Sequence, residues 1–257
     1  MSSARIPLES LSRLFKGLLA SGVSFSLFDE KTFPGTAHYL KHDIHEETAS
    51  ALEIARLERS LGIRSTYFML HRSPKNEKIY DEEKTWMDLR AIQALGHEVA
   101  MHVDGFTLVE RYGSVSSGIN AAFLEFRVEG IHIRGANAHG NSVAIHNSNF
   151  HPCNFYVELA TKNECQDPYW NAHYKKCSIV EKGFQFWADS SVWIGGGVRK
   201  CGVYFSDNKG DWVINPGAKS SWKHFDAVNM TPDSVSAIVD KVKGGSCLYL
   251  IHPQFYG

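Results

Sequence analysis

Hydrophobic residues recur along this chain at two spacings, and segments with the two spacings alternate. Apolar positions three or four residues apart predict helices over residues 8–19, 48–61, 86–95, 119–126 and 231–242. Glycines follow several of these stripes, as Gly22 and Gly62 do, and glycine is a common residue just beyond a helix end. Thr231 and Pro232 form a typical helix start.

Short β-prone runs lie between these helices. They predict strands over residues 24–28, 36–43, 65–70, 97–102, 131–133, 184–189, 203–206 and 247–251. From residue 36 to residue 102 the order is strand, helix, strand, helix, strand, which is the βαβ pattern. Because such crossovers are right-handed, the sequence predicts an α/β fold with parallel strands.

The periodic pattern is lost between residues 134 and 178, where Asn, His and Gly are frequent. Long irregular segments inside compact domains are usually functional loops. The chain contains no internal repeat, low-complexity tract or domain boundary. We therefore expect a single domain over residues 1–257 with an irregular inserted segment near 134–178.

Composition narrows the class of protein. At 257 residues and 43% hydrophobic content, the chain can bury a large core. Its 27 basic and 28 acidic residues are spread without long runs, which argues against a nucleic-acid partner. The first 22 residues lack the apolar stretch of a signal peptide, and no segment approaches the roughly 20 apolar residues of a membrane span. These features predict a soluble cytoplasmic protein, and they set no oligomeric state.

Polar residues stand where several predicted strands end. They are His42, Asp43 and His45 after the strand over 36–43, His102 and Asp104 after the strand over 97–102, and His252 after the last strand. The carboxyl ends of parallel strands meet at one edge, where ligands and catalytic groups collect. A carboxylate two residues from an imidazole can face the same cavity, one as a base and the other as a metal ligand.

Five short segments carry a resemblance to a known family. They are KHDIH at 41–45, GIRSTYFML at 62–70, GHEVAMHVD at 96–104, DSSVW at 189–193 and LIHP at 250–253. In order and spacing they resemble the polysaccharide deacetylases of carbohydrate esterase family 4, in the branch whose first motif reads like Arg-His-Asp-Val-Asp. The resemblance covers residues 39–106 well and the rest only through the short segments.

The resemblance implies a fold, a metal and roles for individual residues. The implied fold is a distorted (β/α)7-type barrel of parallel strands wrapped by helices, with a divalent metal at its C-terminal face. By position Asp43 matches the general base of the family, His102 the first metal-binding histidine and His252 the general acid.

The resemblance also implies contacts with a carbohydrate substrate. Arg134 matches the arginine that orients the base, and Trp193 matches the aromatic wall of the acetyl pocket. Asp104 and Asp189 are further candidates for substrate binding.

The chain departs from the family pattern at two metal positions. His45 stands where the family has a metal-binding aspartate, and Phe106, which cannot ligate a metal, stands where it has the second histidine. His45 and His102 still offer two imidazoles, with His139 or Asp104 as the third ligand. The favoured metal is zinc. Three neutral ligands would leave it the full charge that activates water.

The sequence therefore predicts a metal-dependent hydrolase. Its substrate would carry an acetyl group or another amide on an amino sugar of a surface polysaccharide, such as a lipopolysaccharide O-antigen, or of its precursor. The alternative is a non-catalytic carbohydrate-binding relative that has lost the metal site. A deacetylase-like enzyme acting on a sugar carboxamide would use the same groups.

Overall fold

The computed structural model describes residues 5–28, 37–45, 48–71, 82–140, 155–156, 177–188, 191–194, 197–208, 211–215 and 223–257, with residues 191–194 and 197–200 described by their backbone alone. The helices are α1 (Leu8–Ala20), α2 (Ala49–Ser60), α3 (Glu82–Ala94), α4 (Gly105–Tyr112), α5 (Val115–Val128) and α8 (Pro232–Val242). The strands are β1 (Phe25–Ser26), β2 (His38–Ile44), β3 (Thr66–Leu70), β4 (Glu98–Val103), β5 (Gly135–Ala138), β6 (Phe186–Ala188), β7 (Ser191–Ile194), β8 (Gly197–Lys200), β9 (Val203–Asn208), β10 (Asp211–Asn215), β11 (Lys223–Asp226) and β12 (Cys247–Ile251). A short 3₁₀ turn, η2 (Pro253–Phe255), follows β12.

These strands form one sheet in the order β11-β10-β9-β12-β2-β3-β4-β5-β6-β7-β8, with β1 paired to β2. The strands β9, β12, β2, β3, β4, β5 and β6 are mutually parallel neighbours. Antiparallel strands extend the sheet at each end. The α/β class and the mainly parallel sheet are thus confirmed. The pairings of the described strands do not close the sheet into the predicted barrel.

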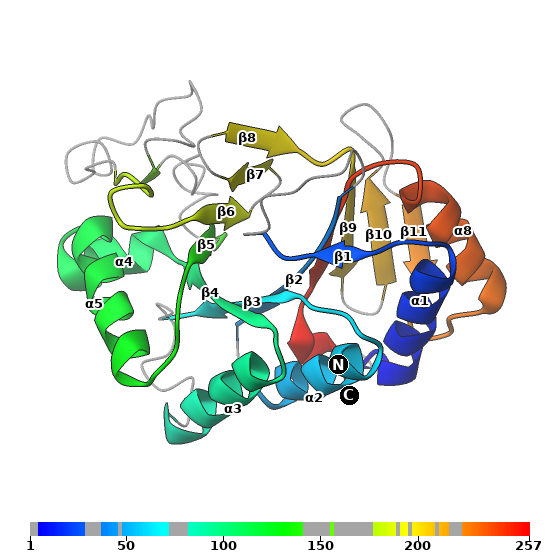
Figure 1. The fold of residues 1–257 in the computed structure, drawn as a ribbon, viewed down its shortest axis with the longest axis horizontal. Helices are drawn as coiled ribbons and strands as arrows, with labels where there is room; N and C mark the ends of the chain where they lie inside the picture. The colour runs from blue at the N-terminus through cyan, green and yellow to red at the C-terminus, as the bar shows by residue number, and fades with distance from the viewer. Residues whose placement is uncertain are drawn as a thin grey trace.

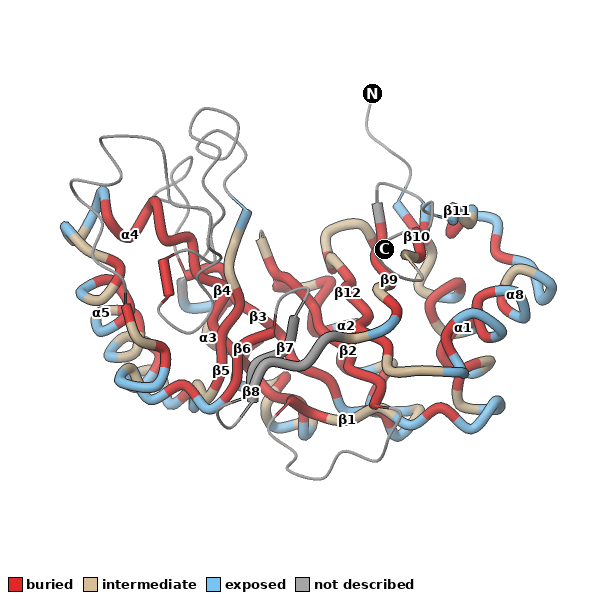
Figure 2. The backbone as a smooth tube through the Cα atoms, turned by 90° about the horizontal axis from the view of Figure 1, so that it is seen from above, coloured by how far each residue is buried: buried red, intermediate tan, exposed pale blue. Residues whose placement is uncertain are grey.

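The sheet is nevertheless strongly curled. In a flat sheet, β2 and β6 would lie about 19 Å apart, since four strand spacings separate them. Yet Lys41 Nζ on β2 lies 3.2 Å from the carbonyl oxygen of Ala188 on β6. The rings of Phe28 and Phe186 also stack across the inside, with centroids 5.4 Å apart. The inner faces of distant strands therefore meet, and Figure 2 shows the strands as a curved row.

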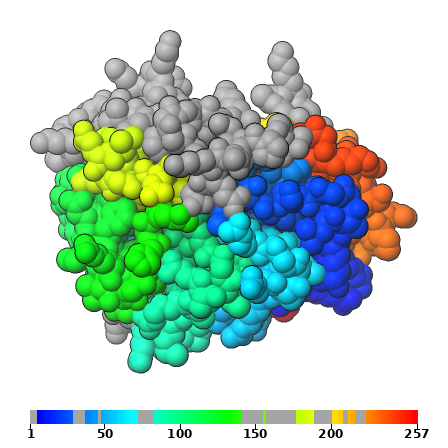
Figure 3. All heavy atoms as spheres, viewed as in Figure 1, coloured from blue at the N-terminus to red at the C-terminus, as the bar shows by residue number. Residues whose placement is uncertain are grey.

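The helices pack around the outside of this curve (Figure 1). In the space-filling view from the same side, the chain colours of α5, α3, α2, α1 and α8 follow one another around the lower and lateral surface (Figure 3). The apolar stripes predicted from the sequence face the sheet: α1 buries Leu11, Leu14 and Leu18, and burying one such side chain contributes about 1.5–3 kcal/mol. Thr231 caps α8 by accepting a hydrogen bond from the Ser234 amide, as its sequence predicted. No helix in the described ranges has the length and hydropathy of a membrane span.

Side chains of β2 alternate between the two faces of the sheet. Leu40 and Ile44 belong to the cores beneath the helices, whereas Tyr39 packs on Phe28 inside the curve. Lys41 reaches inward as well, to the Ala188 carbonyl. Because successive strand residues point to opposite faces, this pattern fixes the direction of every other β2 side chain.

His42 accordingly points away from Asp43, and it does not join the polar cluster in which the sequence placed it. Its Nε2 lies 2.7 Å from Oε1 of Glu58 on α2, and both side chains are fully buried. Glu58 also accepts hydrogen bonds from Ser65 Oγ and Tyr67 OH. Burial alone would raise the pKa of Glu58. His42 and the hydrogen bond from the Ser65 hydroxyl outweigh this effect and hold that pKa below its usual range. His42 is thus a structural residue that ties α2 to the sheet.

Strand β5 differs from its prediction. The sequence placed a strand at residues 131–133, but the strand spans Gly135–Ala138, inside the segment expected to be irregular. Gly135 is essential to its fit, because a Cβ at this position would overlap the Phe186 ring of β6. The sequence also gave no indication of α4, β7, β8, β10 or β11.

We expect Gly135→Ala to destabilise the fold by about 1–3 kcal/mol, since an added methyl group must displace a buried ring. Chemical denaturation of the variant measures the loss. Gly244→Ala is the matched control, because a Cβ there meets no atom within 4 Å. Equal free energies of unfolding for the two variants would contradict the packing described for β5 and β6.

Candidate metal centre

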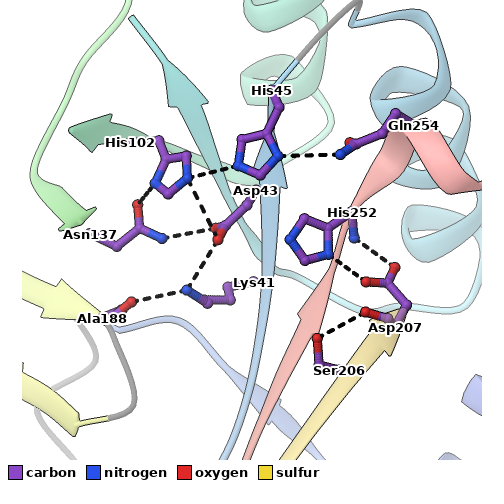
Figure 4. Close-up of polar contacts among 10 residues, drawn as sticks. All are labelled: Lys41, Asp43, His45, His102, Asn137, Ala188, Ser206, Asp207, His252 and Gln254. Atoms are coloured by element: carbon purple, nitrogen blue, oxygen red, sulfur yellow. Dashed lines mark hydrogen bonds and ion pairs between the residues drawn. The ribbon is translucent and has the colours of Figure 1, made fainter. Parts of the chain in front are cut away.

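Four strands of the parallel sheet bring polar side chains to one edge. Asp43 and His45 lie at the end of β2, His102 near the end of β4, His139 just after β5 and His252 just after β12. In the parallel register β4 and β5 place His102 opposite Asn137, two residues before His139. Figure 4 shows most of these side chains converging on one point, as the strand-end hypothesis predicted.

Three imidazoles form a compact triangle at this point. The ring centroids of His45, His102 and His139 lie 4.9–5.0 Å apart. One nitrogen from each lies within 4.8 Å of the other two, and Nε2 of His45 is 2.9 Å from Nε2 of His102. The structure therefore brings together the three histidines that the sequence singled out as metal ligands.

In each of these imidazoles, Nδ1 contacts a polar side chain outside the triangle. The contacts are His102 with Asn137 Oδ1 at 2.6 Å, His139 with Asp104 Oδ2 at 3.3 Å, and His45 with Gln254 Nε2 at 3.2 Å. Metal-binding histidines usually have such an outer partner, which fixes the orientation of the ring. With Nδ1 occupied in all three, Nε2 is the nitrogen left for an ion. The residues present thus fit a divalent metal such as zinc.

The two imidazoles next to Asp43, one buried and one partly buried, favour the neutral form. Burial lowers the pKa of His45 to about 4, although the carboxylate of Asp43 opposes this shift. Burial likewise lowers the pKa of His102 well below its usual range. A neutral imidazole retains the lone pair that a metal requires, so the environment supports ligation at neutral pH.

Asp43 lies on the inner face with only 5% exposure. Its Oδ1 accepts a hydrogen bond of 2.8 Å from Asn137 Nδ2, and its Oδ2 lies 3.4 Å from Lys41 Nζ and 3.8 Å from His102 Nε2. Burial alone would raise the pKa of Asp43, but Lys41 and the surrounding histidines outweigh it and hold that pKa well below its usual range. Asp43 is therefore an ionised carboxylate.

His252 has the opposite protonation preference. Its backbone amide donates to Asp207 Oδ2 at 2.7 Å, and its Nδ1 contacts Asp207 Oδ1. Burial alone would lower the pKa of His252, but the hydrogen bond and the charge of Asp207 outweigh it and raise that pKa. The ring centroids of His252 and His45 lie 5.3 Å apart. One nitrogen of each ring lies within 4.8 Å of a carboxylate oxygen of Asp43. One site thus contains an ionised carboxylate and an imidazole that favours its protonated form.

The structure corrects the expected role of Arg134. This residue precedes β5, and its Nη2 lies 2.9 Å from Oε1 of Glu98, the first residue of β4. The ion pair therefore lies toward the amino ends of these strands. Lys41 and Asn137 make the contacts that orient Asp43.

The other predicted residues have different outcomes. Asp104 contacts His139 and caps α4 by accepting from the Thr107 amide, so it holds a candidate ligand in place. Phe106 is buried against Phe155, in keeping with its loss of ligating chemistry. Asp189 lies outside the described residues. Trp193 lies in β7, whose side chains are not described.

Sequence reasoning missed Lys41, Asn137, Asp207 and Gln254. Three of them stand two residues from a predicted site residue: Lys41 from Asp43, Asn137 from His139 and Gln254 from His252. Strand alternation was therefore a usable signal for Lys41 and Asn137. Asp207 carried no such signal, because its strand was expected to end at Ser206.

Comparison of the chain with protein-family models, with curated proteins and with solved structures gives no match. Membership of the deacetylase family therefore remains a resemblance carried by the five sequence segments. The assignment of chemistry depends on the geometry of the residues described above.

We expect His102→Ala and His139→Ala each to weaken zinc binding by more than about 100-fold, because each removes one of three converging nitrogens. Competition with a chromophoric chelator measures the affinity. His132→Ala is the matched control, since His132 is exposed and precedes the amino end of β5, whereas the candidate site lies at the carboxyl ends of the strands. Zinc affinity unchanged in both site variants would place the metal elsewhere.

Proposed function

We propose that this protein is a metal-dependent hydrolase that cleaves an amide, most simply an N-acetyl group, on an amino sugar. The observation that carries the proposal is the placement of Asp43 and His252 beside three convergent imidazoles. A base, an acid and a metal site within one small volume are the groups that amide hydrolysis requires.

The metal would be held by His45, His102 and His139. Bound there, a zinc ion would supply Lewis acidity toward water and toward the amide carbonyl.

Asp43 would act as the general base. Its carboxylate is ionised and faces the inner side of the sheet, so it can accept a proton from water. The Lys41 ammonium keeps this carboxylate charged but also makes it a weak base. Asp43 therefore needs water that is more acidic than bulk water, which supports hydrolysis that depends on a metal.

His252 would act as the general acid. An amide cleaves readily only if the departing nitrogen gains a proton, because a free amide anion is a very poor leaving group. Asp207 favours the protonated imidazole and holds it through Nδ1, leaving Nε2 to donate. The non-catalytic alternative is less well supported, because carbohydrate binding alone gives this pair no role.

The sugar is proposed from the resemblance to polysaccharide deacetylases. The amino sugar would belong to a surface polysaccharide, such as a lipopolysaccharide O-antigen, or to its precursor. The cytoplasmic location predicted from the sequence favours the precursor.

We expect the zinc-loaded protein to release acetate from N-acetylated amino-sugar oligosaccharides, and Asp43→Asn to abolish the release. The amide is isosteric with the carboxylate but cannot accept a proton at neutral pH. Coupled detection of acetate measures turnover, and circular dichroism and zinc titration check that fold and metal are retained. Oligosaccharide binding without acetate release by the wild type would favour the carbohydrate-binding alternative.

The second expectation concerns pH. Catalysis by protonated His252 should be lost as pH rises through its raised pKa. Asp207→Asn removes the charge that favours the imidazolium, so the pKa of His252 should fall and the alkaline limb of the kcat profile should move to lower pH. An unshifted alkaline limb would show that another group donates the proton.

A further inference from the structure

We propose that Gln254 is a positioning residue whose amide orientation decides which nitrogen of His45 carries the proton. Nε2 of His45, which faces the site, then carries either a proton or a lone pair. The effect of Gln254 on metal binding rests on the metal centre of the proposed function. The tautomer of His45 is a property of the metal-free protein.

The proton positions can be followed from Asp43 outward. Asn137 turns its Nδ2 group toward Asp43 Oδ1 at 2.8 Å, because the carboxylate, already contacted by Lys41, can only accept. Asn137 therefore presents its oxygen to His102 Nδ1 at 2.6 Å. His102 must donate from Nδ1, so its Nε2 has a lone pair directed into the site.

The same reasoning extends to Gln254. Nε2 of His45 lies 2.9 Å from Nε2 of His102, which carries a lone pair, so His45 donates from Nε2. Its Nδ1 is then an acceptor, and Gln254 Nε2 lies 3.2 Å from it. The donors thus form one continuous chain from Gln254 through His45, His102 and Asn137 to Asp43, and Figure 4 draws each of its links.

This arrangement suits the metal-free site only. Ligation requires lone pairs at Nε2 of both His45 and His102. His102 already has its lone pair there, whereas His45 has its proton there. His45 must move this proton to Nδ1, and Nδ1–H then needs an acceptor.

Gln254 can provide that acceptor by a half-turn of its amide, which exchanges Nε2 for Oε1. Asn137 has no such freedom, because Asp43 fixes its orientation. The two outer amides therefore differ in function: Asn137 holds one tautomer permanently, and Gln254 can serve both. A glutamine suits a site that gains and loses its metal, whereas a carboxylate would favour the ligating tautomer alone.

The test uses Gln254→Glu and Gln254→Leu, with Gln93→Glu as the control that adds the same charge on a half-buried position of α3, away from the site. In metal-free protein with ¹⁵N-labelled histidine, the His45 signals are assigned by their loss in His45→Gln. We expect Nδ1 of His45 to be unprotonated in the wild type and protonated in Gln254→Glu. Gln93→Glu should match the wild type.

Zinc affinity provides the second measurement. We expect Gln254→Leu to bind zinc about 10–100-fold more weakly than the wild type, because His45 Nδ1–H loses its acceptor. Gln254→Glu should bind more tightly than both the wild type and Gln93→Glu. A His45 Nδ1 protonated in the metal-free wild type, or equal zinc affinities in all four proteins, overturns the proposal. A wild type that binds no zinc overturns the proposed metal-dependent function, and the nitrogen signals then still decide the role of Gln254.

Discussion

The buried charge of Asp43 is the constraint on which the site depends. A carboxylate with 5% exposure is tolerated only where cations and donors compensate for lost water. Lys41 and Asn137 do so, and each contact has a further effect. Lys41 also reaches the Ala188 carbonyl and so joins β2 to β6 across the curled sheet. Asn137, whose amide is oriented by the carboxylate, presents its oxygen to His102 Nδ1. One charge thereby helps to order both the imidazoles and the inner face.

Environment, not residue type, separates the histidines into two roles. His45 and His102 lie beside Asp43, yet burial dominates and both favour the neutral form that ligation needs. His252 is partly buried, but a second carboxylate, Asp207, contacts its ring directly and reverses the preference. The contact with Asp207 thus separates His252, the proposed acid, from His45 and His102, the candidate metal ligands. The same rule separates acids from bases in many hydrolytic sites.

Much of the fold was predictable because its strongest signals are local. The stripes of α1, α2 and α8 and the strands β2, β3, β4 and β12 appear where hydrophobic periodicity placed them. The failures have physical causes. GANA has little β propensity, so β5 is defined by the contact of Gly135 with Phe186, which lies 51 residues away in the sequence. His42 was grouped with Asp43 by proximity along the chain, although alternation puts them on opposite faces. Asp207 depends on the pairing of β9 with β12, which no local pattern reveals.

Residues 252–257 complete the site, and the segment around Ile6 holds them in place. Ile6 pairs with Tyr256 in a parallel bridge, its amide donates to the Phe255 carbonyl at 2.7 Å, and Gly257 donates back to its carbonyl. Between this clamp and β12 lie His252 and Gln254. During synthesis on the ribosome, the carboxylate and most of the imidazoles would emerge long before their acid and their outer amide. The nascent protein would therefore pass through a stage in which the candidate ligands exist without the proposed acid and without Gln254.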